Sequence, residues 1–239
     1  YIIMLGLGVG FYRLGGNDYI GSTWLPSEIG SLIHWYQFNT GITTTVISST
    51  GKQIQSWDDQ KGSNNLAPID LDDGGSVDVD ESPKLDDDGS VLFNQADDNL
   101  GFSSQLRLGA FSIYARVSSS NFNDIFMESS DESEFIKLHS TTEIRVQPGG
   151  SRKDITVSGL STNTKFTFGI ERDGEGQFYA FINGTGQDTE GITEDTSNTI
   201  NLDRIGAPLQ QMNIYEILIF SNALSSANRT LVNAHLDAL

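Results

Sequence analysis

The stretch from Asn213 to Leu239 constrains the fold more than any other part of the chain. Residues 214–220 (Ile-Tyr-Glu-Ile-Leu-Ile-Phe) are almost all β-branched, aromatic or apolar, which predicts a strand buried in a core. Asn222 ends this run, and the Ser225 hydroxyl can cap a helix by accepting an unpaired N–H of its first turn. Behind that cap, residues at helical spacing predict one docking stripe: Leu224, Ala227, Leu231, Ala234 and His235. We therefore expect the chain to close with one strand and one terminal helix.

Short segments of strand character, separated by turns, fill the chain before this end. The clearest is Phe111–Val117, where Phe111, Ile113, Ala115 and Val117 alternate with polar residues and should share one buried face. Further strands are expected over residues 32–38, 46–47, 53–57, 91–93, 125–128, 134–139, 143–147, 165–171, 177–182 and 200–205. Strands this short at this spacing are typical of a β-sandwich or jelly roll.

Composition excludes several classes of protein. The 239 residues include no Cys, which rules out a disulfide scaffold and any Cys-based metal site or nucleophile. Asp and Glu number 32 against 14 Lys and Arg, a net charge of −18 that would repel nucleic acid and anionic membrane surfaces. We interpret most of this charge as a solvated acidic surface, with cation binding as the alternative. No secretory signal or segment of membrane-spanning length is expected.

The first residues differ from the rest of the chain. Glycines alternate there with apolar side chains, so the segment should need another surface for stability. It either lies along its own domain, as an edge strand, or forms an arm that docks on a neighbouring subunit. Under the second alternative the docking residues are Leu5, Leu7, Val9, Phe11, Tyr12, Tyr19 and Trp24. We predict an arm over residues 1–28, whose first 26 residues would make the contact, and one β-sandwich over residues 29–239.

Several landmarks occur in an order known from one fold family. The pieces are Leu32-Ile-His-Trp-Tyr36, Gln53-Ile-Gln-Ser-Trp-Asp-Asp-Gln-Lys-Gly62, Val91-Leu-Phe-Asn, Phe178-Tyr-Ala-Phe-Ile-Asn-Gly184 and the closing segment from Arg204-Ile-Gly206 to Ser225. Together they resemble concanavalin A-like, LamG-like jelly-roll domains over residues 29–239. The resemblance implies an all-β sandwich with a terminal helix. The acidic, Cys-free sandwich that follows an apolar, glycine-rich arm also looks like structural proteins of marine bacteriophage virions.

The family includes glycan hydrolases, which depend on a pair of carboxyl groups at the active site. The laminarinase-type branch carries alternating acids on one strand, whereas Glu128-Ser-Ser-Asp131-Glu132-Ser-Glu134 has the wrong spacing and is predicted to contain a turn. We therefore predict no catalytic residues and no enzyme activity.

Calcium is the family's other theme, and three acidic clusters offer oxygen ligands: residues 70–74, residues 86–89 and residues 97–99. A solvated loop is favoured for each, so no cofactor and no metal site is predicted, although calcium stays open. His34, His139 and His235 lack metal-ligand spacing. Trp35 and Trp57 are expected to pack in the fold, and Trp24 against a neighbour.

Three functions remain from different classes. The first is a non-enzymatic structural or binding module, a virion decoration or appendage protein that docks through residues 1–26 on other virion proteins or like subunits, as part of an oligomer or larger assembly. The second is a secreted lectin that binds a surface glycan, outside the cell. The third is a glycan hydrolase with a displaced catalytic pair. No nucleic-acid or membrane partner is expected.

Overall fold

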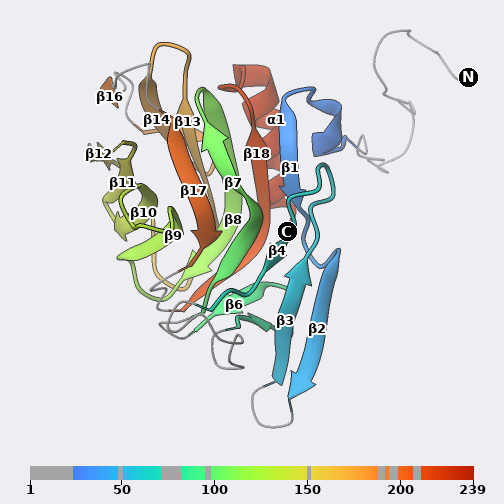
Figure 1. Cartoon of the computed structure of the whole chain (residues 1–239). Helices are drawn as coiled ribbons and strands as arrows, with labels where there is room; N and C mark the ends of the chain where they lie inside the picture. The colour runs from blue at the N-terminus through green and yellow to red at the C-terminus, as the bar shows by residue number, and fades with distance from the viewer. Residues whose placement is uncertain are drawn as a thin grey trace, which may run out of the picture.

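The computed structural model describes residues 24–47, 51–70, 82–94, 98–149, 152–187, 192–193, 199–206 and 211–239. Two layers of antiparallel strands pack face to face (Figure 1). The first, sheet I, orders its main strands β1-β18-β8-β13-β14, and the second, sheet II, runs β2-β3-β4-β7-β17-β9-β10-β11-β12. This arrangement confirms the predicted all-β sandwich with a terminal helix.

Sheet I comprises β1 (Leu32–Tyr36), β6 (Val91–Phe93), β8 (Phe111–Ser119), β13 (Phe166–Arg172), β14 (Gln177–Ile182), β15 (Thr185–Gly186), β16 (Ile192–Thr193) and β18 (Met212–Phe220). Sheet II comprises β2 (Ile42–Ile47), β3 (Gly51–Trp57), β4 (Leu66–Ala67), β7 (Leu100–Leu108), β9 (Asp124–Glu128), β10 (Phe135–Ser140), β11 (Glu143–Gln147), β12 (Lys153–Thr156) and β17 (Ile200–Ile205). Short β5 (Lys84–Leu85) pairs with both β3 and β6 and joins the two layers at one edge.

The core lies between the layers and follows the sequence alternation. Phe111, Ile113, Ala115 and Val117 of β8 are completely buried there, as predicted. Burial of each large apolar side chain stabilises the fold by about 1.5–3 kcal/mol relative to an exposed one. The residues between them on β8 point to the outer face of sheet I, where a second buried cluster contains Tyr114.

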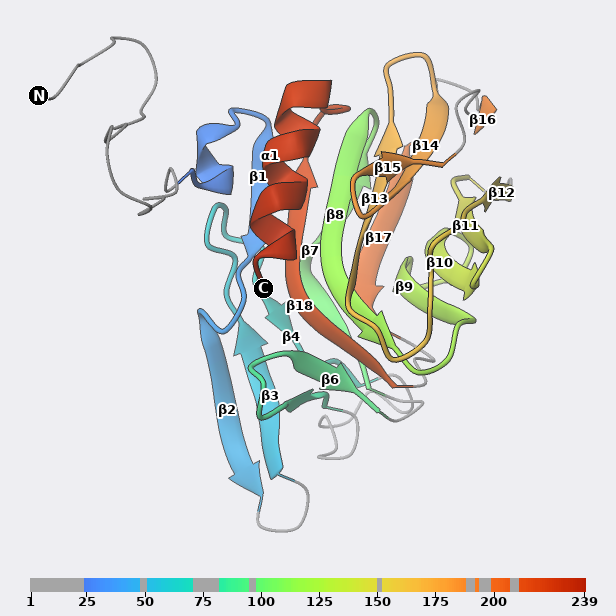
Figure 2. The ribbon, with the colours of Figure 1, turned by 180° about the vertical axis from the view of Figure 1, so that it is seen from behind.

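The terminal helix α1 (Ser226–Asp237) covers part of that outer face (Figure 2). Ser225 is its N-cap, and the side chain accepts a hydrogen bond from the Asn228 backbone N–H at 3.3 Å, as expected. The first described elements of the chain, η1 (Pro26–Glu28) and then β1, lie beside this helix. No helix in the described ranges is long and apolar enough to cross a membrane.

The predicted helix stripe was correct at Leu224 and His235, which contact sheet I, but wrong at its other three residues. Leu231 is 38 % exposed and Ala227 and Ala234 are exposed, whereas Val232, Asn233 and Leu236 face the sheet. The reason is that polar residues share the docked face: Arg229 bonds the buried Glu171 carboxylate, and Asn233 donates back to the Arg229 carbonyl oxygen. A stripe assigned mainly from apolar side chains therefore left out the polar residues that dock the helix.

Candidate functional site

The outer face of sheet II carries a set of hydrogen-bonded polar side chains. We define the open-face cluster as Gln105 of β7, Glu128 of β9, Glu134 of the β9–β10 turn, and Asn201, Asp203 and Arg204 of β17. Strand alternation explains most of it, because Ile200 and Leu202 enter the core and leave Asn201 outside. A register shift between Leu202 and Arg204 then re-aims the strand, as a bulge does, so that Arg204 joins the outer face while Ile205 returns to the core.

Glu128 and Arg204 form an almost completely enclosed ion pair at the centre of the cluster. The Glu128 Oε1 accepts from Arg204 Nε at 2.7 Å and from Nη2 at 2.6 Å, and the side chains are 2 % and 8 % exposed. Burial raises the pKa of the Glu128 carboxyl above its ordinary value, although Arg204 opposes the shift. Arg204 is thus fixed by its partner.

Two further carboxylates are held just as firmly beside this pair. Glu134 accepts from the Asn201 backbone N–H and side-chain amide at 2.9 and 2.6 Å, and from the Gly149 N–H at 2.6 Å. Asp203 Oδ2 accepts from the Ser130 backbone N–H at 2.8 Å, and both Asp203 carboxylate oxygens lie 3.1 Å from the donating Gln105 Nε2. These bonds join four segments of chain and give the face a fixed arrangement of acceptors.

The β9–β10 turn, which the sequence predicted at residues 129–133, borders the cluster through the contact of Ser130 with Asp203. The Ser129 and Ser133 hydroxyls donate to the exposed Asp131 carboxylate and lower its pKa to about 2. Glu132 has a left-handed backbone at φ 59° and a side chain that is 74 % exposed, 3.5 Å from Arg204. Asp131 and Glu132 are thus the two exposed carboxylates of this turn, whereas Glu128 and Glu134 are buried.

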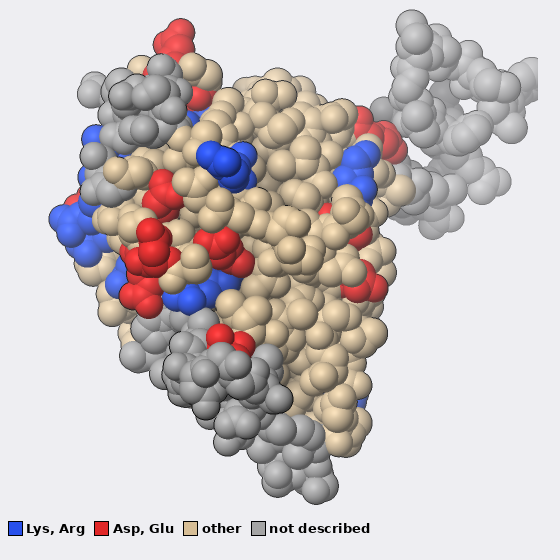
Figure 3. Space-filling view, viewed as in Figure 1, with Lys and Arg blue, Asp and Glu red and all other residues tan. Residues whose placement is uncertain are grey.

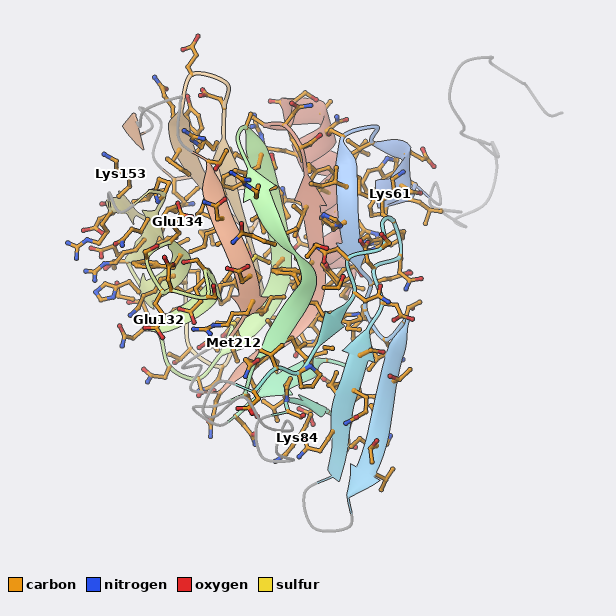
Figure 4. The ribbon with its side chains drawn as sticks, in the orientation of Figure 1. Lys61, Lys84, Glu132, Glu134, Lys153 and Met212 are labelled. Atoms are coloured by element: carbon orange, nitrogen blue, oxygen red, sulfur yellow. The ribbon has the colours of Figure 1, made fainter. Side chains whose placement is uncertain are left out.

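Acidic groups predominate on this side of the molecule. Asp and Glu gather over β9, β10 and β17 with a few cations among them, while the centre of the face beside them is uncharged (Figure 3). Figure 4 shows Glu132 and Glu134 on this same side. The uncharged part includes the exposed Ser103, Ser104 and Gln105 of β7. At the cluster itself the carboxylates of Glu128, Asp131, Glu132, Glu134 and Asp203 lie near the guanidinium groups of Arg107 and Arg204, and Lys137 of β10 lies further along the same face.

The predicted docking residues lie mostly outside the described part of the chain. Of that set only Trp24 is described, whereas Leu5, Leu7, Val9, Phe11, Tyr12 and Tyr19 are not. Trp24 packs on its own domain, with its ring edge-on to His235 at a centroid distance of 6.1 Å. Docking through the arm therefore stays a prediction, as does the boundary at residue 28.

Other candidate residues serve the framework. Trp35 and Trp57 are buried, as predicted. His34 bonds the enclosed Asp59 carboxylate at 2.7 Å, and His235 bonds the buried Glu216 at 2.5 Å. Although burial alone raises the pKa of Asp59, its hydrogen bonds to His34 and to the backbone N–H groups of Gly62, Trp35 and Lys61 hold it well below its ordinary value.

Among the residues that the structure describes, no group of three His, Asp or Glu is arranged to hold a metal ion. The acidic cluster at residues 86–89 is described in full, but parts of those at 70–74 and 97–99 are not. Asp88 of the first cluster accepts from Ser90 and from the Tyr215 hydroxyl, so it is tied to β18.

Sequence reasoning did not single out Gln105, Asn201, Asp203 or Arg204. The signal available was the pair Asp203-Arg204 in an alternating strand, because Arg204 stands where the alternation from Ile200 and Leu202 calls for an apolar residue. Their meeting with the β9–β10 turn depends on strand order, which no local pattern contains.

The chain matches no family model and no curated protein in sequence. In structure it is similar to Trypanosoma rangeli sialidase, with a TM-score of 0.57 and 10% identity over 87% of this chain and 33% of that one. It is also similar to the botulinum neurotoxin serotype D ligand-binding domain in complex with N-acetylneuraminic acid (TM-score 0.56, 14% identity, 83% and 52% coverage). The binding domain of botulinum neurotoxin DC in complex with rat synaptotagmin II gives a TM-score of 0.55 at 15% identity, with 84% and 52% coverage.

The chain thus spans about a third to a half of the proteins that it resembles in structure. At such low identity the likeness establishes the fold, a lectin-like β-sandwich.

Proposed function

We propose that this chain is a non-enzymatic carbohydrate-binding module and that the open-face cluster is its ligand site. The observation that carries the proposal is the fixed set of polar groups on an uncovered part of sheet II, in which the exposed Gln105 and the partly exposed Asn201 and Asp203 are held in place by framework bonds. Sugar hydroxyls require such preorganised acceptors and donors, since a rigid site loses little entropy when it binds. The lectin-like fold and the sialic-acid complex of one neighbour support the same class of ligand.

The charge of the site points to a neutral glycan. Glu128, Asp131, Glu132, Glu134 and Asp203 surround two arginines, and Arg204 is already neutralised by Glu128. A sialylated sugar would bring another carboxylate into this negative field, on a chain whose net charge is −18. Phe135 lies directly across from Glu128 in the sheet and is partly exposed, so its ring offers a surface for the apolar face of a sugar.

Binding without hydrolysis follows from the way the acids are used. A glycosidase needs one carboxyl to protonate the leaving oxygen and a second to attack or activate water. Glu128 is enclosed with Arg204, and Glu134 and Asp203 accept bonds from the framework. Neutral glycans bound by the chain should therefore remain intact when reducing ends are measured, and their release would overturn this part of the proposal.

A glycan array, followed by calorimetry on the hits, tests the site. The full chain should bind neutral oligosaccharides and leave sialylated ones unbound. Asp203→Ala should weaken that binding about 10-fold, the effect of losing one charged hydrogen-bonding group. Glu175→Ala removes the same charge from an exposed turn between β13 and β14 and should leave affinity unchanged. Binding confined to sialylated glycans, or equal losses in both variants, would contradict the assignment.

The place of action is the second part of the proposal. A glycine-rich arm over residues 1–26 would attach the module to a virion or to like subunits, or the module would act outside the cell as a secreted lectin. The contact of Trp24 with His235 supports a chain that leaves the sandwich beside α1. Deleting residues 1–23 should lower the oligomeric state measured by light scattering if the arm docks on like subunits. An unchanged oligomer would contradict self-docking, and co-assembly with virion proteins would then be measured directly.

A further inference from the structure

A polar cavity opens on the outer face of sheet I, beyond the end of helix α1. Its volume is about 310 Å³, within the range of small-molecule sites. Its floor is a row of three side chains in register across three strands, Leu92 of β6, Asn213 of β18 and Ser118 of β8. Met212, labelled in Figure 4, marks the adjoining start of β18 at the lower end of the molecule.

The helix stops just short of this row. Its last residue, Asp237, bonds Arg116 Nη1 at 2.8 Å and the Thr167 hydroxyl at 2.9 Å. Arg116 and Ser118 are neighbours on the same face of β8, so the cavity takes up the part of sheet I that α1 leaves uncovered. It faces away from the open-face cluster, which belongs to the other sheet.

Among the described residues, the walls carry one charged group, the Asp86 carboxylate. Asp86, Asn94, Ser120, Asn163 and Gln211 surround the floor. Asn213 is fixed because its amide donates to Asp86 Oδ2 at 3.1 Å and to the Ser90 hydroxyl at 2.8 Å. Gln211 accepts from the Ser120 hydroxyl at 3.0 Å, and Asn163 stands on a left-handed backbone at φ 57°. The site is therefore built from amides and hydroxyls held in place.

One wall group lacks a partner. In the described part of the chain the Asn94 side-chain oxygen is enclosed and accepts no hydrogen bond. An enclosed polar atom without a partner costs about 1–3 kcal/mol, so such atoms in native proteins call for an explanation. The Asn94 side chain is therefore the wall group whose hydrogen-bonding capacity the described residues do not fill.

We propose that this cavity binds a single neutral sugar unit. Amides and hydroxyls both donate and accept, as sugar hydroxyls do, and the Asp86 carboxylate can accept from a sugar hydroxyl. Among the described lining residues there is no Lys or Arg, which disfavours phosphate and carboxylate ligands. Leu92 supplies one apolar contact on the floor. The proposal is independent of the open-face cluster and holds whether or not that face binds a glycan.

Titration of the full chain with neutral monosaccharides, followed by NMR of the side-chain amides, tests the cavity. A ligand of this size should bind with a dissociation constant on the order of 1 mM. The amides of Asn94, Asn163, Gln211 and Asn213 should shift. The double variant Asn94→Ala/Asn163→Gly should weaken binding about 10-fold, because two hydrogen-bonding groups are lost while glycine retains the left-handed backbone.

Two controls make the result decisive. Asp203→Ala, on the other sheet, should leave these shifts unchanged, so that a glycan bound at the open face cannot account for them. Circular dichroism and thermal unfolding check that the double variant remains folded. The proposal is overturned if no cavity amide shifts, if the double variant binds as tightly as the parent, or if the shifts require calcium and disappear with a chelator.

Discussion

The two outer faces of the sandwich are built alike but covered differently. Sheet I carries Glu171, enclosed with Arg229 at 2.9 Å and with the Tyr114 hydroxyl at 2.7 Å, and this group anchors α1. Sheet II carries Glu128, enclosed with Arg204, and among the described residues no helix lies over it. Helix docking thus accounts for the enclosed Glu171 of sheet I. Helix docking does not account for Glu128 of sheet II, and the proposed ligand site would give its cluster a different role.

The covered face is also divided. Where α1 lies, the outward residues of β8 and β18 meet the helix through Tyr114, Leu218 and Phe220. Toward the C-terminal end of β8 and the start of β18, beyond the end of α1, the row through Ser118 and Asn213 is open and polar. On sheet I, polar outward residues therefore contact α1 where the helix lies and line the cavity beyond the end of the helix.

The largest expected effect compares the two enclosed ion pairs. Arg204→Ala should lower the free energy of unfolding by about 3–5 kcal/mol, because Glu128 is left charged and unpaired. Arg229→Ala should cost only about 2 kcal/mol, since Glu171 keeps the hydrogen bond from Tyr114. Urea unfolding measures both. A larger loss for Arg229→Ala would break the comparison.

A rescue experiment sharpens the same point. The double variant Glu128→Met/Arg204→Met replaces the pair by apolar side chains and should recover stability to within about 1 kcal/mol of the parent. It should also lose glycan binding at the open face, which separates the role of the pair in the site from its role in folding.

The helix phase gives the next largest effect. Leu236 is completely buried against sheet I, and Leu231 on the same helix is 38 % exposed. Leu236→Ala should cost about 3 kcal/mol through the cavity that it leaves, whereas the identical change at Leu231 should stay within about 0.5 kcal/mol. A larger loss for Leu231→Ala than for Leu236→Ala in urea unfolding would show that α1 docks with the phase expected from apolar spacing alone.

The enclosed glutamates and the enclosed Asp59 should change the stability of the fold in opposite directions as pH changes. Burial raises the pKa of Glu171 and of Glu128 in the folded chain, so folding binds their protons more tightly and stability rises as pH falls toward about 4.3. The pKa of Asp59 is lowered despite its burial, because hydrogen bonds outweigh it, so its contribution is lost as pH falls below about 3.9.

Stability should therefore peak in mildly acidic solution, as thermal unfolding from pH 3 to pH 7 would measure. Glu171→Gln should flatten the decline on the neutral side of the peak. Asp59→Asn should flatten the acidic side, with a lower stability at neutral pH because its backbone partners lose a charged acceptor. Stability that rises steadily from pH 4 to pH 7 would contradict the direction given for the two glutamates.

Local patterns predicted most of this fold, for identifiable reasons. Residues 91–93, 143–147, 177–182 and 200–205 form strands with the predicted bounds, since each combines alternation with clear turn residues. The long strand β7 was missed because Leu100-Gly-Phe-Ser-Ser-Gln-Leu-Arg-Leu is interrupted in the middle by polar residues and a register shift against β17. That omission hid Gln105, the one member of the open-face cluster that β7 supplies.

Both proposed sites depend on contacts that no local pattern contains. The cluster joins Asp203 to Ser130 across 73 positions, and the cavity joins Asn213 to Asp86 across 127. Alternation states which residues of a strand point outward, but strand order decides what they meet. The turn at residues 129–133 could be predicted, whereas its hydrogen bond to β17 could not.

The smallest expected effect tests where the arm leaves the covered face. Trp24 is partly buried and contacts His235 only edge-on, so Trp24→Ala should cost about 1 kcal/mol. Trp35 is 6 % exposed and donates to the buried Glu216 at 2.8 Å, so Trp35→Ala should cost about 3–5 kcal/mol. If the arm docks on another subunit, Trp24→Ala should lower the oligomeric state while leaving monomer unfolding nearly unchanged. A large loss of monomer stability would instead show that residues before 28 belong to the folded domain, which would move its boundary toward the N-terminus.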